Sequence, residues 1–320
     1  MAEEVQQTNG SGKRRRSRLW NVVFWVALTV CIASLGVLGY IVWGYVSANQ
    51  EYENIAKQAF TVEEGQVEQA GMALGDMTVD WDYLRAVNPE VVGWIYVPGT
   101  RINYPIVHTT DNDRYLHSDF NGASARGGAI FLDFNNKPTF TDENNVIYGH
   151  HMNDGSMFAA LSLQLKNNDE FNAHRDVYVL TPTMNYKCKS FAMVITNGWE
   201  LLVQTTFENP AERAMYIKDK EDRSVVQPEE GMPDPLSIPR LITLSTCDYS
   251  QDNGRAVMFT QIVAQAVPGS GGAGEPITEE DQAALDEGLA LEKEYSGEIE
   301  PAPEPEPAPE AEPAPEQPEA

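Results

Sequence analysis

The hydrophobic and polar positions divide the chain into three parts. Residues 19–50 form a mostly apolar run without a single charged side chain. Between about residue 80 and residue 267, short runs of apolar, β-branched and aromatic residues alternate with Gly, Asn, Asp and Pro. This alternation is typical of strands joined by turns. After residue 268 acidic side chains dominate, and residues 301–320 are little but Pro, Glu and Ala.

The middle part predicts a mostly β fold, either a barrel or a sandwich, because its strand-like runs are short and closely spaced. Eight such runs can be distinguished: residues 90–99, 102–109, 127–134, 144–151, 176–182, 190–198, 240–247 and 255–267. Residues 209–224 interrupt the series and predict a surface helix. Residues 51–78 predict one or two helices that lead into the β region.

Residues 19–50 predict a helix that crosses a membrane, because about 20 apolar residues span the hydrocarbon core. Aromatic rings that favour the lipid–water interface lie towards its two ends: Trp20, Trp25, Trp43 and Tyr45. The alternative is a cleaved signal peptide, but its apolar region would be only about 7–15 residues long. We therefore expect a transmembrane helix over residues 19–46 and a helical stalk over residues 47–79.

Basic residues set the expected orientation of this helix. The sequence KRRRSR, residues 13–18, directly precedes the apolar run, and such residues stay on the cytoplasmic side of a membrane. Residues 1–18 are thus predicted to be cytoplasmic. A single-pass protein of this topology would carry residues 80–267, its main folded domain, outside the cell.

The charge of the chain argues against nucleic acid as a partner. The formal net charge is −26, whereas nucleic-acid-binding proteins present basic surfaces. Residues 269–320 carry sixteen acidic side chains against Lys293 alone, a net −15. A segment this rich in Pro and Glu buries too little apolar surface to offset the entropy of ordering. Residues 268–320 are therefore predicted to be a disordered tail.

One turn of the β region brings a cysteine and an arginine together. The seventh run ends at Cys247, the eighth begins at Arg255, and Asn253-Gly254 before it is a strong turn signal. If the two runs pair antiparallel, Cys247 and Arg255 face each other with side-chain roots about 4.5–5.5 Å apart. A buried cysteine and a surface arginine are each common taken singly. Their spacing favours a thiol nucleophile with a guanidinium beside it that binds a developing oxyanion.

The other cysteines do not form a recognisable framework. Cys31, Cys188 and Cys247 match neither a disulfide scaffold nor a zinc motif, although a Cys188–Cys247 disulfide is the alternative that would leave no nucleophile. A thiol nucleophile needs a proton acceptor, and the fourth run delivers His150 and His151 at a loop. Because neighbours on an extended chain point to opposite sides, only one imidazole is expected to face the cysteine.

Three motifs together resemble the sortases, the cysteine transpeptidases of Gram-positive cell surfaces. They are VIYGHHM at residues 146–152, TLSTC at residues 243–247, and the arginine that follows. The similarity covers roughly residues 80–267 and is greatest to class B. It implies an eight-stranded sortase-type β-barrel with N-terminal helices. It also implies a helix in the long loop between strands six and seven, here residues 199–224, which helps to select the substrate.

The resemblance also implies roles for single residues. Cys247 would be the nucleophile, His150 the catalytic histidine with His151 as a bystander, and Arg255 the residue that steadies substrate and oxyanion. Sorting-signal groove residues would be Ser245, Asn112 and Leu116. No cofactor or metal is implied; one sortase class uses calcium, but no compact acidic cluster in this sequence argues for it.

The implied activity is transpeptidation at the cell surface. The enzyme would cleave the C-terminal sorting signal of a secreted protein after a threonine. It would then transfer the thioacyl group to an amine of a peptidoglycan precursor or to a pilin lysine. Two alternatives are a YkuD-type transpeptidase, whose arginine follows two residues after the cysteine where this chain has Tyr249, and a non-catalytic membrane-anchored surface binding protein.

Overall fold

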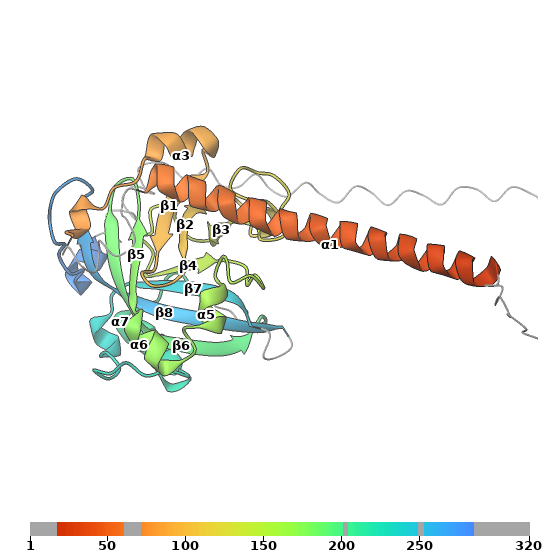
Figure 1. Ribbon diagram of the computed structural model, residues 1–320. Coiled ribbons are helices and arrows are strands. Elements are labelled where there is room, and N and C mark those ends of the chain that lie inside the picture. Colours follow the sequence, from red (N-terminus) through yellow and green to blue (C-terminus); the bar gives the residue numbers. More distant parts are fainter. Residues whose placement is uncertain (1–17, 61–71, 201–203, 249–252, 285–320) are drawn as a thin grey trace, which may run out of the picture. The chain divides into compact units, whose positions relative to one another are not determined.

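The strands of the chain close into a barrel (Figure 1). The computed structural model describes residues 18–60, 72–200, 204–248 and 253–284. The order around the barrel is β1-β2-β3-β4-β7-β8-β6-β5. The strands are β1 Val91–Tyr96, β2 Asn103–Val107, β3 Ile130–Leu132, β4 Asn144–Tyr148, β5 Asp176–Leu180, β6 Asn185–Asn197, β7 Leu241–Asp248 and β8 Gly254–Ala266. Each lies on one of the eight predicted runs, so the predicted β-barrel is confirmed.

The helices lie between and before the strands. They are α1 Arg18–Ala59, α3 Trp81–Val87, α4 Arg114–His117, α5 Ala159–Leu163, α6 Asn168–Ala173 and α7 Pro210–Asp222, with 3-10 turns η1 Leu74–Asp76 and η2 Pro235–Ser237. Helix α7 is the one expected between strands six and seven. It begins where the Asn209 side chain accepts hydrogen bonds from two amides of the first turn, with Pro210 at the first helical position.

Helix α1 joins the predicted transmembrane segment to the stalk without a break, over 42 residues, whereas the sequence suggested a boundary near residue 46. Residues 20–39 within it have a mean hydropathy of 2.4 and are 0% buried. Of the residues described, only these are long and apolar enough to cross a membrane, consistent with the predicted anchor. The last turns are different, because Tyr52, Ile55 and Ala59 are buried in the main core.

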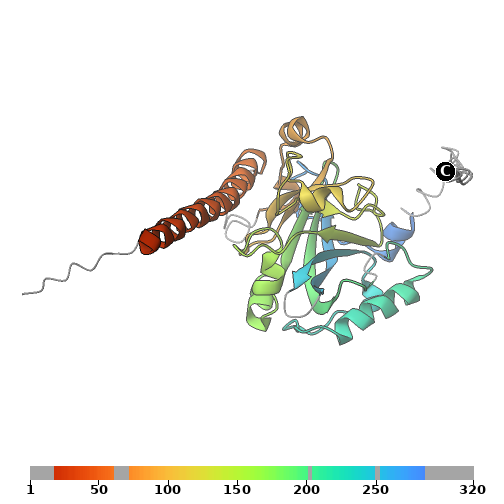
Figure 2. The same cartoon turned by 90° about the vertical axis from the view of Figure 1, so that its right-hand side faces the viewer.

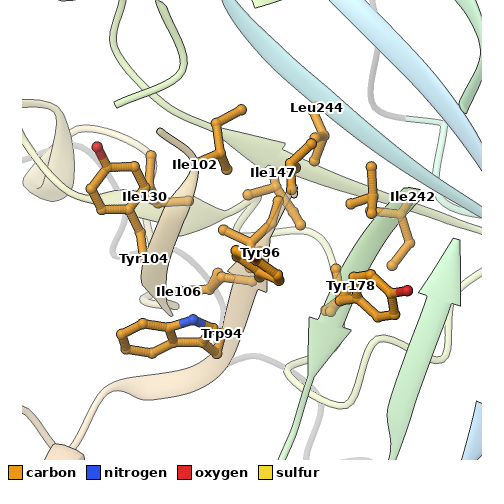
Figure 3. Packing of buried hydrophobic residues seen from close by; sticks show 14 of the residues in the cluster. Trp94, Tyr96, Ile102, Tyr104, Ile106, Ile130, Ile147, Tyr178, Ile242 and Leu244 are labelled. Atoms are coloured by element: carbon orange, nitrogen blue, oxygen red, sulfur yellow. The ribbon is translucent and has the colours of Figure 1, made fainter. Parts of the chain in front are cut away.

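The main core fills the barrel with residues from all of its strands. Figure 3 shows part of it, with labelled residues from β1 to β5 and from β7. Ile147 of β4 and Leu244 of β7 pair across neighbouring strands, and both are fully buried. A second cluster lies on the other face of β6, β7 and β8 and includes Ile217 of α7. Helix α7 packs against β6, outside the strands (Figure 2, turquoise). This cover explains why the runs of β6 and β8 are apolar on both faces rather than alternating.

The first residues of the predicted tail are part of the barrel unit. Gly75 donates its amide to the Gly272 carbonyl at 2.9 Å, and Gln265 and Glu275 exchange two backbone hydrogen bonds of 2.7 and 2.9 Å. Ile277 is buried, and the unit ends at this residue. The prediction of disorder from residue 268 is therefore wrong for residues 268–277, because a glycine-rich turn brings one apolar side chain back onto the domain. Residues 285–320 lie outside the described residues.

Candidate active site

The β7–β8 hairpin places a cysteine and an arginine side by side at one end of the barrel. Cys247 pairs directly with Arg255, and the next pair is Asp248 with Gly254. This register confirms the pairing predicted from the sequence. Both Cys188 and Cys247 are free thiols, which excludes a disulfide between them. Cys247 has intermediate exposure whereas Cys188 is buried, so Cys247 is the thiol of this pair that is accessible to a substrate.

The VIYGHH motif reaches the same end of the barrel through β4. Strand β4 pairs in parallel with β7 as far as Tyr148 and Ser245, and the Gly149 amide then donates to the Ser245 carbonyl at 3.1 Å. Gly149 is required here, because a Cβ atom would lie 2.5 Å from Ile130 Cδ1 and 2.6 Å from Phe158 Cγ. His150, the next residue, therefore leaves β4 at the level where β7 reaches Cys247.

The His150 ring is held by a backbone carbonyl. Its Nε2 atom lies 2.8 Å from the Leu116 carbonyl oxygen. Because a carbonyl only accepts, Nε2 carries the hydrogen and Nδ1 keeps the lone pair of the neutral ring. Gly128, with φ of +55°, lies under the ring, since a Cβ atom there would be 3.1 Å from His150 Cδ2. Leu116, predicted to line the substrate groove, thus also orients the catalytic candidate.

Arg255 lies between two strand ends. It pairs with Cys247 on one side and with Thr196 of β6 on the other. Its Nη1 donates to the Gly254 carbonyl at 3.0 Å, and its side chain is partly buried. Burial raises the pKa of Tyr148 well above its ordinary value, the Asp133 carboxylate raises it further, and the positive charge of Arg255 opposes both. The positive charge of Arg255 therefore reaches Tyr148 at the end of β4 as well as the Cys247 side of the hairpin.

The remaining predicted residues lie around this centre. Ser245 is buried, two residues before Cys247 on β7. Asn112 donates from Nδ2 to the Asp133 carboxylate at 2.8 Å and accepts from the Phe134 amide at 3.1 Å. It thereby ties its loop to the segment after β3. The structure brings Ser245 and Leu116 to the Cys247–His150 region directly and Asn112 through Asp133, which lies beside Tyr148.

Three residues at the site were given no role from the sequence: His151, Gly128 and Tyr52. His151 is buried, and its Nδ1 lies 3.1 Å from the Cys247 carbonyl oxygen. The Tyr52 hydroxyl of α1 donates to the Gly128 carbonyl at 3.0 Å and accepts from the Phe120 amide at 3.1 Å. The HH dipeptide and the unusual Gly127-Gly128 pair were visible signals for two of them. Nothing local marks Tyr52, because its partners are at least 68 residues away in the sequence.

No group of three or more His, Cys, Asp or Glu side chains that could hold a metal ion is found within the described ranges. The chemical groups that the fold brings to this end of the barrel are the Cys247 thiol, the His150 imidazole and the Arg255 guanidinium. A partly exposed thiol paired across a hairpin with an arginine and next to a histidine-bearing strand end is the arrangement of a cysteine acyltransferase.

The comparisons with known proteins define the family. A sequence model of the sortase domain matches residues 95–263, more than half of the chain, and the chain belongs to the sortase family. Sortase B of Listeria monocytogenes is 35% identical over 184 residues, covering 57% of this chain and 73% of the relative. Sortase B of Staphylococcus aureus is 30% identical over 185 residues, covering 57% and 74%.

Solved structures agree with this assignment and with class B. A crystal structure of sortase B from Bacillus anthracis has a TM-score of 0.57 at 28% identity, covering 69% of this chain and 98% of that one. Sortase B from Clostridium perfringens gives 0.52 at 32% identity, covering 56% and 97%. The chain is therefore a class B-like cysteine transpeptidase of the cell wall. The family acts on sorting signals and amine acceptors in general. Membership of this family decides against the YkuD-type and non-catalytic alternatives.

Proposed function

We propose that this chain is a membrane-anchored sortase that cleaves a sorting signal after a threonine and transfers the protein to an amine. The observation that carries the proposal is the direct pairing of Cys247 with Arg255 beside the strand end that bears His150. The substrate complex of Staphylococcus aureus sortase B, a solved structure 26% identical with a TM-score of 0.55, supports the proposal, since that protein binds a substrate on a barrel of the same fold.

The first half of the reaction forms a thioester. The Cys247 thiolate attacks the threonine carbonyl carbon, a carbon–sulfur bond forms, and the carbonyl electron pair moves onto oxygen. The Arg255 guanidinium stabilises this oxyanion. The carbon–nitrogen bond then breaks, and the departing amine takes a proton from imidazolium His150. Since Nε2 of His150 is engaged by the Leu116 carbonyl, Nδ1 is the nitrogen that exchanges the proton.

The second half consumes the thioester. An acceptor amine attacks the same carbonyl carbon and loses a proton to neutral His150, and Cys247 leaves as thiolate. The new bond is an amide, so no oxidant, metal or nucleotide is needed to balance the step. The acceptor amine belongs either to the cross-bridge of a peptidoglycan precursor or to a pilin lysine.

The apolar segment of α1, residues 20–39, supports a single-pass anchor. Five basic residues at positions 13–18 precede it, which favours a cytoplasmic N-terminus and an extracellular catalytic domain. A barrel tethered in this way would meet secreted proteins as they leave the membrane and wall precursors at the outer leaflet.

The test uses the full chain in detergent micelles with peptides that contain Asn-Pro-x-Thr or Leu-Pro-x-Thr-Gly and a small amine acceptor. We expect Cys247→Ala to abolish product formation, and the wild type to form a thioacyl adduct on the Cys247 peptide in mass spectrometry. Cys188→Ala is the matched control and should remain active, because Cys188 is buried in the barrel wall.

Thiol labelling provides a second test, in a Cys31→Ser background that removes the exposed cysteine of α1. A methanethiosulfonate should modify Cys247 much faster than Cys188. Burial raises the pKa of the Cys188 thiol to about 12, so it presents neither access nor thiolate. Product formation by Cys247→Ala, or faster labelling of Cys188, would overturn the proposed function.

A further inference from the structure

The second histidine of the HH pair contacts the strand of the nucleophile. The Gly149 amide donates to the Ser245 carbonyl. In a parallel ladder, evenly spaced amides of one strand bond alternate carbonyls of the next, so the amide of residue 151 would be due to donate to the Cys247 carbonyl. The chain turns away before this point. The His151 side chain takes the place of the amide, with Nδ1 at 3.1 Å from the Cys247 oxygen.

The loop around His151 holds its ring in place. The His151 backbone forms an antiparallel bridge with Met157, and the Phe158 amide donates to the His150 carbonyl at 2.9 Å. The Met157 amide donates in turn to the Tyr104 hydroxyl at 3.0 Å. His151 is only 8% exposed. The His151 imidazole is therefore held between the backbone of its own loop and the end of β7.

The contact fixes the proton of the His151 ring. A carbonyl oxygen only accepts, so Nδ1 of His151 carries the hydrogen in the neutral ring. In His150 the carbonyl-bound nitrogen is Nε2. The two adjacent imidazoles thus hold their protons on opposite ring nitrogens. One presents its lone pair for proton transfer, and the other is a fixed donor to the backbone.

We propose that His151 is a positioning residue for the nucleophile, an inference that rests on the proposed role of Cys247. Its Nδ1–H bond extends the hold of β4 on β7 by two residues, from Ser245 to Cys247. Without it, the pairing of Cys247 with Arg255 of β8 would remain, and the sulfur could shift relative to His150 while keeping that pairing. Small displacements of a reacting atom have large kinetic effects.

An isosteric pair of substitutions tests the bond. Asparagine places an N–H donor on Cγ, as Nδ1 of histidine is placed, whereas aspartate has the same shape and cannot donate when ionised. We expect His151→Asp to lower kcat about 10- to 100-fold with KM changed less than about threefold, and His151→Asn to stay within about threefold of wild type. The control His174→Asp makes the same change at the histidine that packs against Gly99, and should leave kcat unchanged.

An NMR spectrum of the wild type tests the hydrogen bond without any variant. The test therefore remains available if His151→Asp does not fold. In the full chain in micelles with ¹⁵N-labelled histidine, His151 should be protonated at Nδ1 and His150 at Nε2. Protonation of neutral His151 at Nε2, or equal kcat for His151→Asp and His151→Asn, would overturn the positioning role. If Cys247→Ala is inactive and His151→Asp is fully active, only this inference fails. An active Cys247→Ala would instead remove the proposed function.

Discussion

At the beginning of the β4–β7 pair, buried polar side chains form hydrogen bonds. At its end, His150 follows β4 at the level of the partly exposed Cys247, and the His151 ring bonds the Cys247 carbonyl. The Thr243 hydroxyl donates to Asn144 Oδ1 at 2.7 Å, and Asn145 Nδ2 donates to the Leu241 carbonyl at 3.2 Å. Both asparagines are fully buried. We call this the closed end of the pair and the end at Cys247 the open end.

The difference shows how one strand pair serves stability and chemistry together. A polar network in a low-dielectric interior resists rearrangement once its donors are paired. Glu143 extends the closed end, since its carboxylate pairs with Arg213 of α7 and accepts from the Phe207 amide at 2.8 Å. The open end can then expose Cys247 without loosening the barrel. Stability variants should therefore act at the closed end and kinetic variants at the open end.

The largest effect on stability is expected from breaking the closed end at Glu143. Glu143→Leu leaves Arg213, whose side chain is 2% exposed, without its carboxylate. Removal of one partner of a buried ion pair costs about 3–5 kcal/mol of unfolding free energy. Urea unfolding of the full chain in micelles measures this loss.

The control for that experiment is the double variant with Arg213→Leu. Replacing both partners by apolar residues also removes the buried guanidinium charge, so most of the stability should return. The kcat of the folded fraction should stay near wild type in both variants. A double variant as unstable as Glu143→Leu, or a kcat loss that exceeds the unfolded fraction, would break the distinction between the two ends.

At the open end, Arg255→Lys should lower kcat/KM about 10²- to 10³-fold, the usual cost of losing an oxyanion donor. Lysine keeps the charge but loses the planar fork that can bond two acceptors at once. Arg85→Lys in the last turn of α3 is the matched control and should be silent. Steady-state kinetics decide the matter, and wild-type turnover by Arg255→Lys would contradict the oxyanion role.

Much of this architecture was predictable from the sequence because its signals are local. Alternation and turn residues located all eight strands, and Asn253-Gly254 fixed the hairpin that pairs Cys247 with Arg255. The class B resemblance then predicted His150 as the catalytic partner, and the structure places this residue after β4 at the level of Cys247. Helix α7 was recognisable as well, from a polar stretch that begins with Asn209-Pro210.

The missed features all depend on contacts between distant segments. Strands β4 and β7 lie side by side although about 97 residues separate paired positions such as Asn144 and Leu241, and parallel pairing leaves no turn in the sequence to announce it. The bond from His151 to the Cys247 carbonyl depends on that pairing. The docking of Tyr52 onto Gly128 similarly joins segments 76 residues apart.

A smaller effect is expected where residues 270–277 return to the barrel. A chain truncated after residue 277 should match the wild type, whereas truncation after residue 269 exposes the surface that Ile277 covers and should cost about 1.5–3 kcal/mol. Peptide cleavage by both truncated chains should persist. Glu275 pairs with Gln265, which lies at the opposite end of β8 from Arg255. Loss of cleavage in the shorter chain at full folding would place this segment in the site.

The smallest effect concerns the ionic cluster that holds the start of the β6–β7 loop at the open end. The Arg223 guanidinium, with Lys220 and Thr196, holds the pKa of Glu200 well below its ordinary value of 4.5. A lowered carboxyl pKa stabilises the folded state fully above the unfolded pKa, and this contribution is lost as the pH falls below it. Glu200→Gln should therefore cost about 1 kcal/mol near pH 7, and the difference from wild type should shrink steadily below pH 4.5. Glu208→Gln, at an exposed acid in the same loop, is the control and should leave the free energy of unfolding near that of the wild type. A wild-type advantage that is independent of pH would mean that the cluster contributes through packing rather than charge.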